Sequence, residues 1–188
     1  IIEADESDGS IVQYEPEIGL LLNIDKDHQE IEELMQIFGV FKKNTKDLFV
    51  VNQSNHLAKQ LSADLSHDFS LEENSGAGYI ATHFKQDGMF IRFNIGQNIF
   101  LLNTVGKHNM ENALAATAVA HLIGISYKDC AAGLNHYEGI YRRHQLLGIK
   151  KGLYVIDDYA HNPAKCAASI KACQPIAGKV VAWFQPHG

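Results

Sequence analysis

Two asparagines stand three residues apart at the start of a strongly apolar helical pattern, in the stretch GKHNMENALAATAVAHLIG at 106–124. At that spacing Asn109 and Asn112 share one helix face, where two carboxamides can present a donor and an acceptor to a flat heterocycle. His108 stands beside them, where the first backbone N–H groups of a helix have no intrahelical partner. A lone Asn109 would be an N-cap. The pair instead favours binding of an adenine edge.

Carboxylates and a histidine follow apolar runs that have the length of strands. Glu3 ends the run that opens the chain, within EADESD, and His28 closes NIDKDH after the next run. Ligands of open α/β sheets gather at the carboxyl ends of strands, so these side chains are candidates for a divalent metal site. The alternatives are a solvated acidic loop, which the density of like charge alone favours, and a His28 without chemistry at a helix start.

Two more kinds of side chain complete this set. Arg142 and Arg143 are adjacent in a predicted turn, where they would neutralise phosphate oxygens near a phosphate site and would otherwise be solvated or contact carboxylates. Asp158 ends a further apolar run, GLYVIDD. Phosphoryl transfer from a nucleotide requires a metal ion, a cationic side chain and residues that hold the nucleotide base. The phosphate loop GxxxxGK[ST] does not occur in the sequence.

The helices and strands that must position these groups are predicted from the spacing of apolar residues. Near-continuous apolar runs predict buried parallel strands at 1–4, 18–24, 47–52, 152–158 and 179–184. Helical spacing predicts helices at 29–43, 53–61, 106–124, 126–135 and 164–172. Short alternating runs between 79 and 102 predict a small antiparallel sheet. The predicted fold class is α/β, with a mostly parallel central sheet, flanking helices and a small antiparallel sheet.

The composition bounds the class of protein. The 188 residues include 46% hydrophobic residues and carry a formal net charge of -6, which argues against a nucleic-acid partner. No run approaches the roughly 18 apolar residues of a membrane span. The three cysteines have no metal-like spacing, which is typical of a reducing compartment such as the cytoplasm. Both ends fall at predicted strands, and we expect them to be cuts in a longer protein.

Six motifs occur in an order that is specific to one enzyme family: EADESD, NIDKDH, GKHNMENALAA, GIYRRHQ, DDYAHNP and FQPH. On these motifs the chain resembles, from end to end, the Mur ligases, the ATP-dependent amide-bond-forming enzymes of bacterial cell-wall synthesis. It is most similar to the branch that joins UDP-N-acetylmuramate to L-alanine and to the sister branch that recycles murein peptides. The resemblance implies that 1–140 is part of the central ATPase domain and 141–188 the start of a Rossmann-like C-terminal domain.

The resemblance also assigns ligands to residues. ATP and Mg²⁺ are the implied cofactors, and Glu3 and His28 look like magnesium ligands. His108, Asn109 and Asn112 look like nucleotide-binding residues, with the two asparagines as the adenine contacts. The implied partners are UDP-N-acetylmuramate and L-alanine or a murein peptide, with no nucleic acid and no membrane.

Arg143, Asp158 and His161 are the implied catalytic residues: the first two look like nucleotide contacts, and His161 looks like a residue near the incoming substrate. In the implied reaction a carboxylate attacks the γ-phosphate of ATP, and an amine then attacks the resulting acyl phosphate. Magnesium and Arg143 would offset charge in the first step.

Two residues depart from the branch pattern. His144 stands where a Phe is usual, and Asn162 replaces a second His, so these changes concern the identity of the amine. Two alternatives stay open: a recycling ligase, and a degenerate module that binds nucleotide without turnover. Without its phosphate loop, the chain by itself is expected to be inactive.

Overall fold

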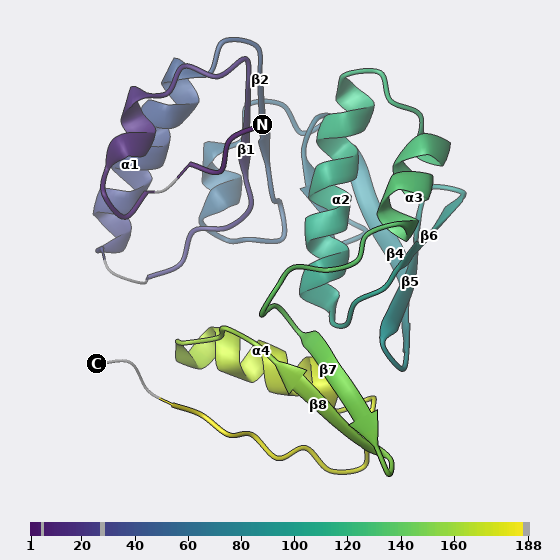
Figure 1. Ribbon diagram of the computed structural model, residues 1–188. Coiled ribbons are helices and arrows are strands. Elements are labelled where there is room, and N and C mark those ends of the chain that lie inside the picture. The colour runs from purple at the N-terminus through teal and green to yellow at the C-terminus, as the bar shows by residue number, and fades with distance from the viewer. Residues whose placement is uncertain (5, 27–28, 186–188) are drawn as a thin grey trace. The chain divides into compact units, whose positions relative to one another are not determined.

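The computed structural model describes residues 1–4, 6–26 and 29–185 (Figure 1). The chain forms two compact units. The first comprises Ile1–Ala81 and Leu114–Ser126, and the second comprises Thr82–Ala113 and Tyr127–Gly188. Among the described residues, none of the helices combines the length and apolarity needed to cross a membrane.

The first unit is built on a parallel strand pair and the helix that connects its strands. Strands β1 (Ile18–Leu21) and β2 (Leu48–Val51) pair in parallel, and α1 (Ile31–Asn44) lies beside them (Figure 1). The core is formed by residues that recur at helical spacing in α1 and by inward residues of both strands: Leu21, Leu34, Phe38, Phe41, Phe49 and Val51. Parallel strands need a crossover connection of this kind. The predictions of two strands and a helix here are confirmed.

The strands continue through a backbone bridge from Asn52 to Phe69. Strand β3 (Phe69–Ser70) pairs in parallel with β4 (Tyr79–Asp87), and the sheet order is β3-β4-β5-β6. Strands β5 (Phe90–Ile95) and β6 (Asn98–Leu102) are antiparallel. The α/β class is therefore confirmed, with parallel pairing followed by the predicted antiparallel segment.

Helices α2 (Lys107–Leu122) and α3 (Tyr127–Asn135) confirm the helices predicted at 106–124 and 126–135. Helix α3 packs against β6. Gly106, just before α2, has φ 87°, and a Cβ atom there would lie 2.6 Å from the His108 ring. This turn therefore requires glycine, which has no Cβ and adopts positive φ without strain.

The C-terminal part of the second unit is an antiparallel ribbon followed by a helix. Strand β7 (Gln145–Lys150) pairs with β8 (Leu153–Asp157), and α4 (Pro163–Cys173) follows. Pro163 is the first helical residue, as predicted, and the Asn162 side chain accepts a hydrogen bond from the Lys165 N–H at 2.8 Å. Strand β8 and α4 were predicted, whereas no strand was predicted at 145–150, where β7 forms.

Three predicted elements are wrong. Residues 1–4 and 179–184 form no strand, and Ile2, Val181 and Trp183 are 72%, 81% and 98% exposed. An apolar run becomes a strand only where a neighbouring backbone pairs with it. Only the 3-10 helix η2 (Ala58–Leu61) forms within 53–61, because the side chains of Asn52 and Asn55 accept hydrogen bonds from nearby N–H groups and favour turns.

Candidate functional site

The loop after β8 holds a carboxylate in a single orientation. Asp158 Oδ2 accepts a hydrogen bond from the His144 backbone N–H at 2.9 Å and lies 3.2 Å from Nδ1 of the same residue. Oδ1 accepts from the Ala160 N–H at 2.9 Å. The His144 side chain is 6% exposed and that of Asp158 is 16% exposed. The carboxylate is thus fixed by partners on both sides of it in the sequence, but solvent still reaches it.

The start of α2 contacts the same pair. The His108 and His144 rings are 5.1 Å apart between centroids, with a 33° angle between their planes. Burial lowers the pKa of His108, the charge of His144 lowers it further, and the Asp158 carboxylate acts in the opposite direction. Burial disfavours the charged form of an imidazole, so His108 is held as a neutral ring.

The two asparagines of α2 have different surroundings. The Asn109 side-chain amide donates to Thr104 Oγ1 at 2.9 Å and to the Val105 carbonyl at 2.8 Å, so it fastens the preceding turn to the helix. The Asn112 side chain is exposed. Asn112 can therefore offer a donor and an acceptor to a ligand, whereas Asn109 uses its donor within the protein.

Two guanidinium groups and an imidazole gather around Tyr159. The guanidinium carbons of Arg142 and Arg143 lie 5.0 and 5.9 Å from the centre of its ring, and the His161 ring lies 5.7 Å away. Arg142 Nε is also 3.5 Å from Asp157 Oδ2. Both arginines and His161 are exposed. Because Arg142 approaches Asp157, Arg143 is the guanidinium of this cluster that we expect to neutralise an anionic ligand.

The backbone of the turn at 140–144 is strained. Arg142 and His144 have φ values of 57° and 45°, a region that costs a residue with a Cβ atom about 1 kcal/mol or more. The turn is kept by the hydrogen bond from the Tyr159 N–H to the Arg142 carbonyl, at 2.9 Å, and by the Arg142 N–H donating to Gln145 Oε1, at 3.1 Å. Such strain persists where surrounding contacts over-determine the conformation.

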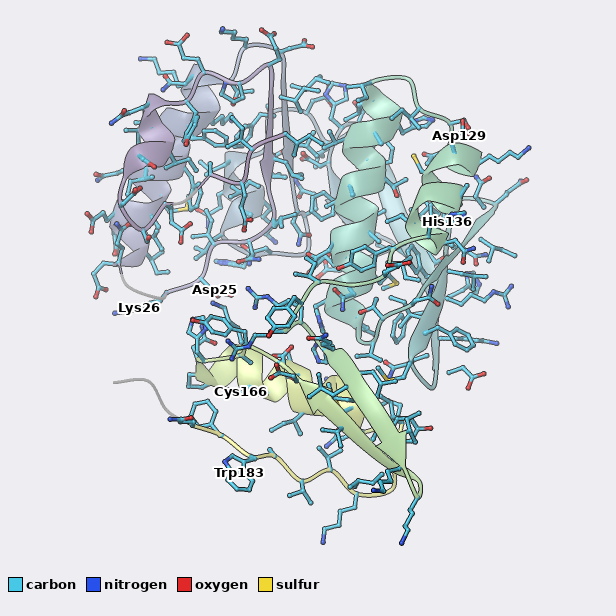
Figure 2. The ribbon with its side chains drawn as sticks, viewed as in Figure 1. Asp25, Lys26, Asp129, His136, Cys166 and Trp183 are labelled. Carbon is cyan, nitrogen blue, oxygen red and sulfur yellow. The ribbon has the colours of Figure 1, made fainter. Side chains whose placement is uncertain are left out.

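A cavity of about 730 Å³ lies beside this loop and is lined by Asp158, His161, β8, α4 and the segment that runs to Phe184. Cys166 on α4 and Trp183 on that segment both line it and are labelled in Figure 2. Burial raises the pKa of the Cys173 thiol in its wall, and the Asp158 carboxylate raises it further. The cavity is therefore mostly apolar, with polar groups at the loop.

The sequence matches the Mur ligase middle domain over residues 1–120. The chain belongs to the Mur ligase family. The match ends inside the first of the two domains predicted from the sequence, so the boundary at residue 140 stays a prediction.

Similar proteins agree with this assignment. The chain is 35% identical over 206 aligned residues to the UDP-N-acetylmuramate--L-alanine ligase of a Nostoc species, and 33% identical over 196 to that of Gloeobacter violaceus. Each alignment covers 100% of this chain and 42% of the relative. This Mur ligase chain thus spans about two fifths of the length of the curated relatives it matches.

Solved structures show the same fold. The UDP-N-acetylmuramate-alanine ligase MurC from Thermotoga maritima gives a TM-score of 0.78 at 21% identity, over 91% of this chain and 41% of that one. A murein peptide ligase from Psychrobacter arcticus gives a TM-score of 0.61 at 24% identity, over 88% and 36%. The Mur ligase fold is therefore reproduced in these two described units.

The predicted nucleotide and metal residues of this Mur ligase chain fare differently. Within the second unit, His108 and Asp158 both contact His144. The start of α2 and the loop after β8 therefore lie beside each other. Glu3 is exposed in the first unit, and His28 lies outside the described residues. Within 1–4, 6–26 and 29–185, no three His, Cys, Asp or Glu side chains are grouped to hold a metal ion. The assignment of Glu3 and His28 as magnesium ligands therefore stays a prediction.

Sequence reasoning missed one residue of the site altogether. Gln86 Oε1 accepts from the Gly106 N–H at 3.0 Å, and its Nε2 donates to the Ala172 carbonyl at 2.9 Å. It thereby ties β4 to the turn before α2 and to the last turn of α4. No local signal identifies it, because Gln86 is an unremarkable polar position in an alternating strand pattern.

Proposed function

We propose that the chain is part of an ATP-dependent ligase that forms the amide bond between UDP-N-acetylmuramate and L-alanine through an acyl phosphate. The observation that carries this proposal is the 35% identity, over the whole chain, to the UDP-N-acetylmuramate--L-alanine ligase of Nostoc. The activity is proposed for the complete gene product, with Mg²⁺ as its metal and the cytoplasm as its compartment.

The proposed nucleotide contacts come from two segments of the second unit. The exposed carboxamide of Asn112 pairs with the donor and acceptor of an adenine edge, while Asn109 and His108 shape the turn beneath it. Arg143 neutralises phosphate charge with an exposed guanidinium. A carboxylate has about four acceptor sites, so Asp158 retains one for a nucleotide hydroxyl after its three described contacts.

The amine side of the reaction is assigned to the cavity. His161 lines it, and its Nδ1 is 3.2 Å from the Tyr159 carbonyl oxygen, so Nδ1 carries the proton of a neutral ring. Nε2 then has a lone pair and lies 3.4 Å from Lys165 Nζ. We propose that His161 contacts the incoming substrate from this position.

The test is amide formation by the complete gene product with ATP, Mg²⁺ and UDP-N-acetylmuramate. We expect L-alanine to be used with a kcat/KM at least about tenfold above that of a murein peptide, equivalent to about 1.4 kcal/mol. A preference for the peptide would assign the recycling reaction. Nucleotide binding without amide formation from either amine would assign a non-catalytic module.

Arg143 and its neighbour supply a matched pair of variants for the same assay. Removing a group that stabilises developing charge typically costs about 10²-fold in kcat, which is the loss expected for Arg143→Ala. Arg142 pairs with Asp157, and Arg142→Ala is expected to keep kcat within about threefold. An Arg143→Ala enzyme with the wild-type kcat would refute the assignment of this residue.

A further inference from the structure

Both ring nitrogens of His144 face oxygen acceptors. Nδ1 is 3.2 Å from Asp158 Oδ2, and Nε2 is 3.4 Å from the Ser169 carbonyl oxygen on α4. A neutral imidazole carries one N–H, so it would turn a bare nitrogen toward one of these oxygens, whereas an imidazolium donates to both. The geometry therefore favours the charged ring, in a pair with the carboxylate.

The charged and titratable groups around this pair come from every segment packed against it: Arg142 and Arg143 beside His144, Asp157 at the end of β8, His108 on α2 and Cys173 on α4. The two arginines lie over the Tyr159 ring, and Arg142 also approaches Asp157. Burial lowers the pKa of His108 and raises that of Cys173. The Asp158 carboxylate is therefore the counter-charge of the buried His144 ring.

The backbone reinforces this contact. With φ 45° at His144, the N–H and the ring of this one residue both reach Asp158 Oδ2. A rotation of the carboxylate would break both contacts at once. The same ring contacts α4 through Ser169 and lies against His108 at the start of α2. His144 thus joins the strained turn to three other segments.

We propose that His144 is a positioning residue for Asp158: as an imidazolium it fixes the carboxylate at the end of β8 and fastens that loop to α4 and to the start of α2. This role rests on the proposed function, in which Asp158 is a nucleotide contact. It predicts that the nucleotide affinity of the protein depends on a side chain that does not itself touch the nucleotide.

The charge state is tested by NMR of the complete gene product labelled with ¹⁵N at histidine, with the His144 signals assigned from their loss in His144→Asn. We expect two protonated ring nitrogens for His144 near neutral pH, and a neutral ring in Asp158→Asn. His136, an exposed residue whose Nδ1 contacts the Ala132 carbonyl, is the internal control and should not change. A singly protonated His144 in the wild type, or one that Asp158→Asn leaves unchanged, would overturn the proposal.

The positioning role is tested by calorimetric titration with ATP, which requires no ligase turnover. Leucine removes the ring's hydrogen bond to the charged carboxylate, so we expect ATP to bind about tenfold or more weakly to His144→Leu. His144→Asn places an amide N–H near the position of Nδ1 and should restore most of the affinity. Asp157→Asn, which removes the neighbouring carboxylate, should bind as the wild type does.

The outcomes separate the two proposals. Equal ATP affinity of His144→Leu and the wild type, with the fold retained by circular dichroism, would refute the positioning role. An unrescued loss in His144→Asn would refute it too, because it would make His144 a packing residue only. A wild type that binds ATP but forms no amide would refute the proposed ligase and leave the His144 result to stand on the NMR and affinity data.

Discussion

Asp68 and Asp158 are both held by backbone N–H groups, but their surroundings give them different uses. Asp68 is fully buried in the first unit, where its carboxylate accepts from the Val51 N–H at 2.8 Å and from side chains of Gln53 and Ser62. Asp158, in the second unit, keeps some exposure and pairs with an imidazole. A carboxylate surrounded by neutral donors serves the fold, whereas one with a titratable partner and access to a cavity can also serve a ligand.

The largest expected effect is on stability, at Asp68. Asp68→Asn turns one acceptor into a donor that faces other donors in a buried site, which should lower the free energy of unfolding by about 3 kcal/mol. Chemical denaturation followed by circular dichroism measures the change. Asp64→Asn is the control, because exposed Asp64 accepts from the N–H and hydroxyl of Ser66 and lies 3.9 Å from His67 Nδ1. Solvent-exposed contacts of this kind contribute little, so the midpoint should stay unchanged. Equal midpoints for Asp68→Asn and the wild type would remove the contrast between the two aspartates.

The two asparagines of α2 allow the same comparison, between a residue that stabilises the fold and one that faces a ligand, within one helix. Asn109→Ala should lower the free energy of unfolding by about 1–2 kcal/mol, because the turn at Thr104 and Val105 loses its partner. Asn112→Ala should leave stability unchanged and weaken ATP binding about tenfold. Thermal denaturation and calorimetric titration of both variants give the result. A loss of stability in Asn112→Ala, with none in Asn109→Ala, would contradict the structural role of Asn109 and the ligand-binding role of Asn112.

The smallest effect expected is a pH dependence from His108. Its pKa is lowered by burial and by the charge of His144, so the unfolded chain binds more protons than the folded one below the ordinary histidine pKa of about 6.5. The stability associated with neutral His108 is therefore complete above that pH and is lost as the pH falls toward the lowered value. His108→Gln should flatten this part of a plot of Tm against pH, and His136→Gln, at an exposed site, should not. Parallel profiles for the wild type and His108→Gln would contradict the assignment.

Local pattern was a reliable guide where an element buries its own apolar stripe. Helix α1 carries Leu34, Phe38 and Phe41 at helical spacing, and they form the core that this spacing predicts. The same reasoning was wrong for residues 179–184, which are as apolar as β2 but have no strand beside them among the described residues. Strand β7 was missed for the converse reason, since GIYRRHQ reads as a turn and only pairing with β8 makes the following residues extended.

Residue types and their order in the chain were enough to establish an α/β chain, its membership of the Mur ligases and the candidate residues at the start of α2 and the end of β8. Those properties depend on short-range spacing, which the printed sequence contains. The tertiary structure decided which of the candidates are engaged: Asn109 in its own turn, Asp158 with His144, and Gln86 between Gly106 and Ala172. Each of the last two contacts joins residues far apart in the chain, and no local pattern encodes such a pairing.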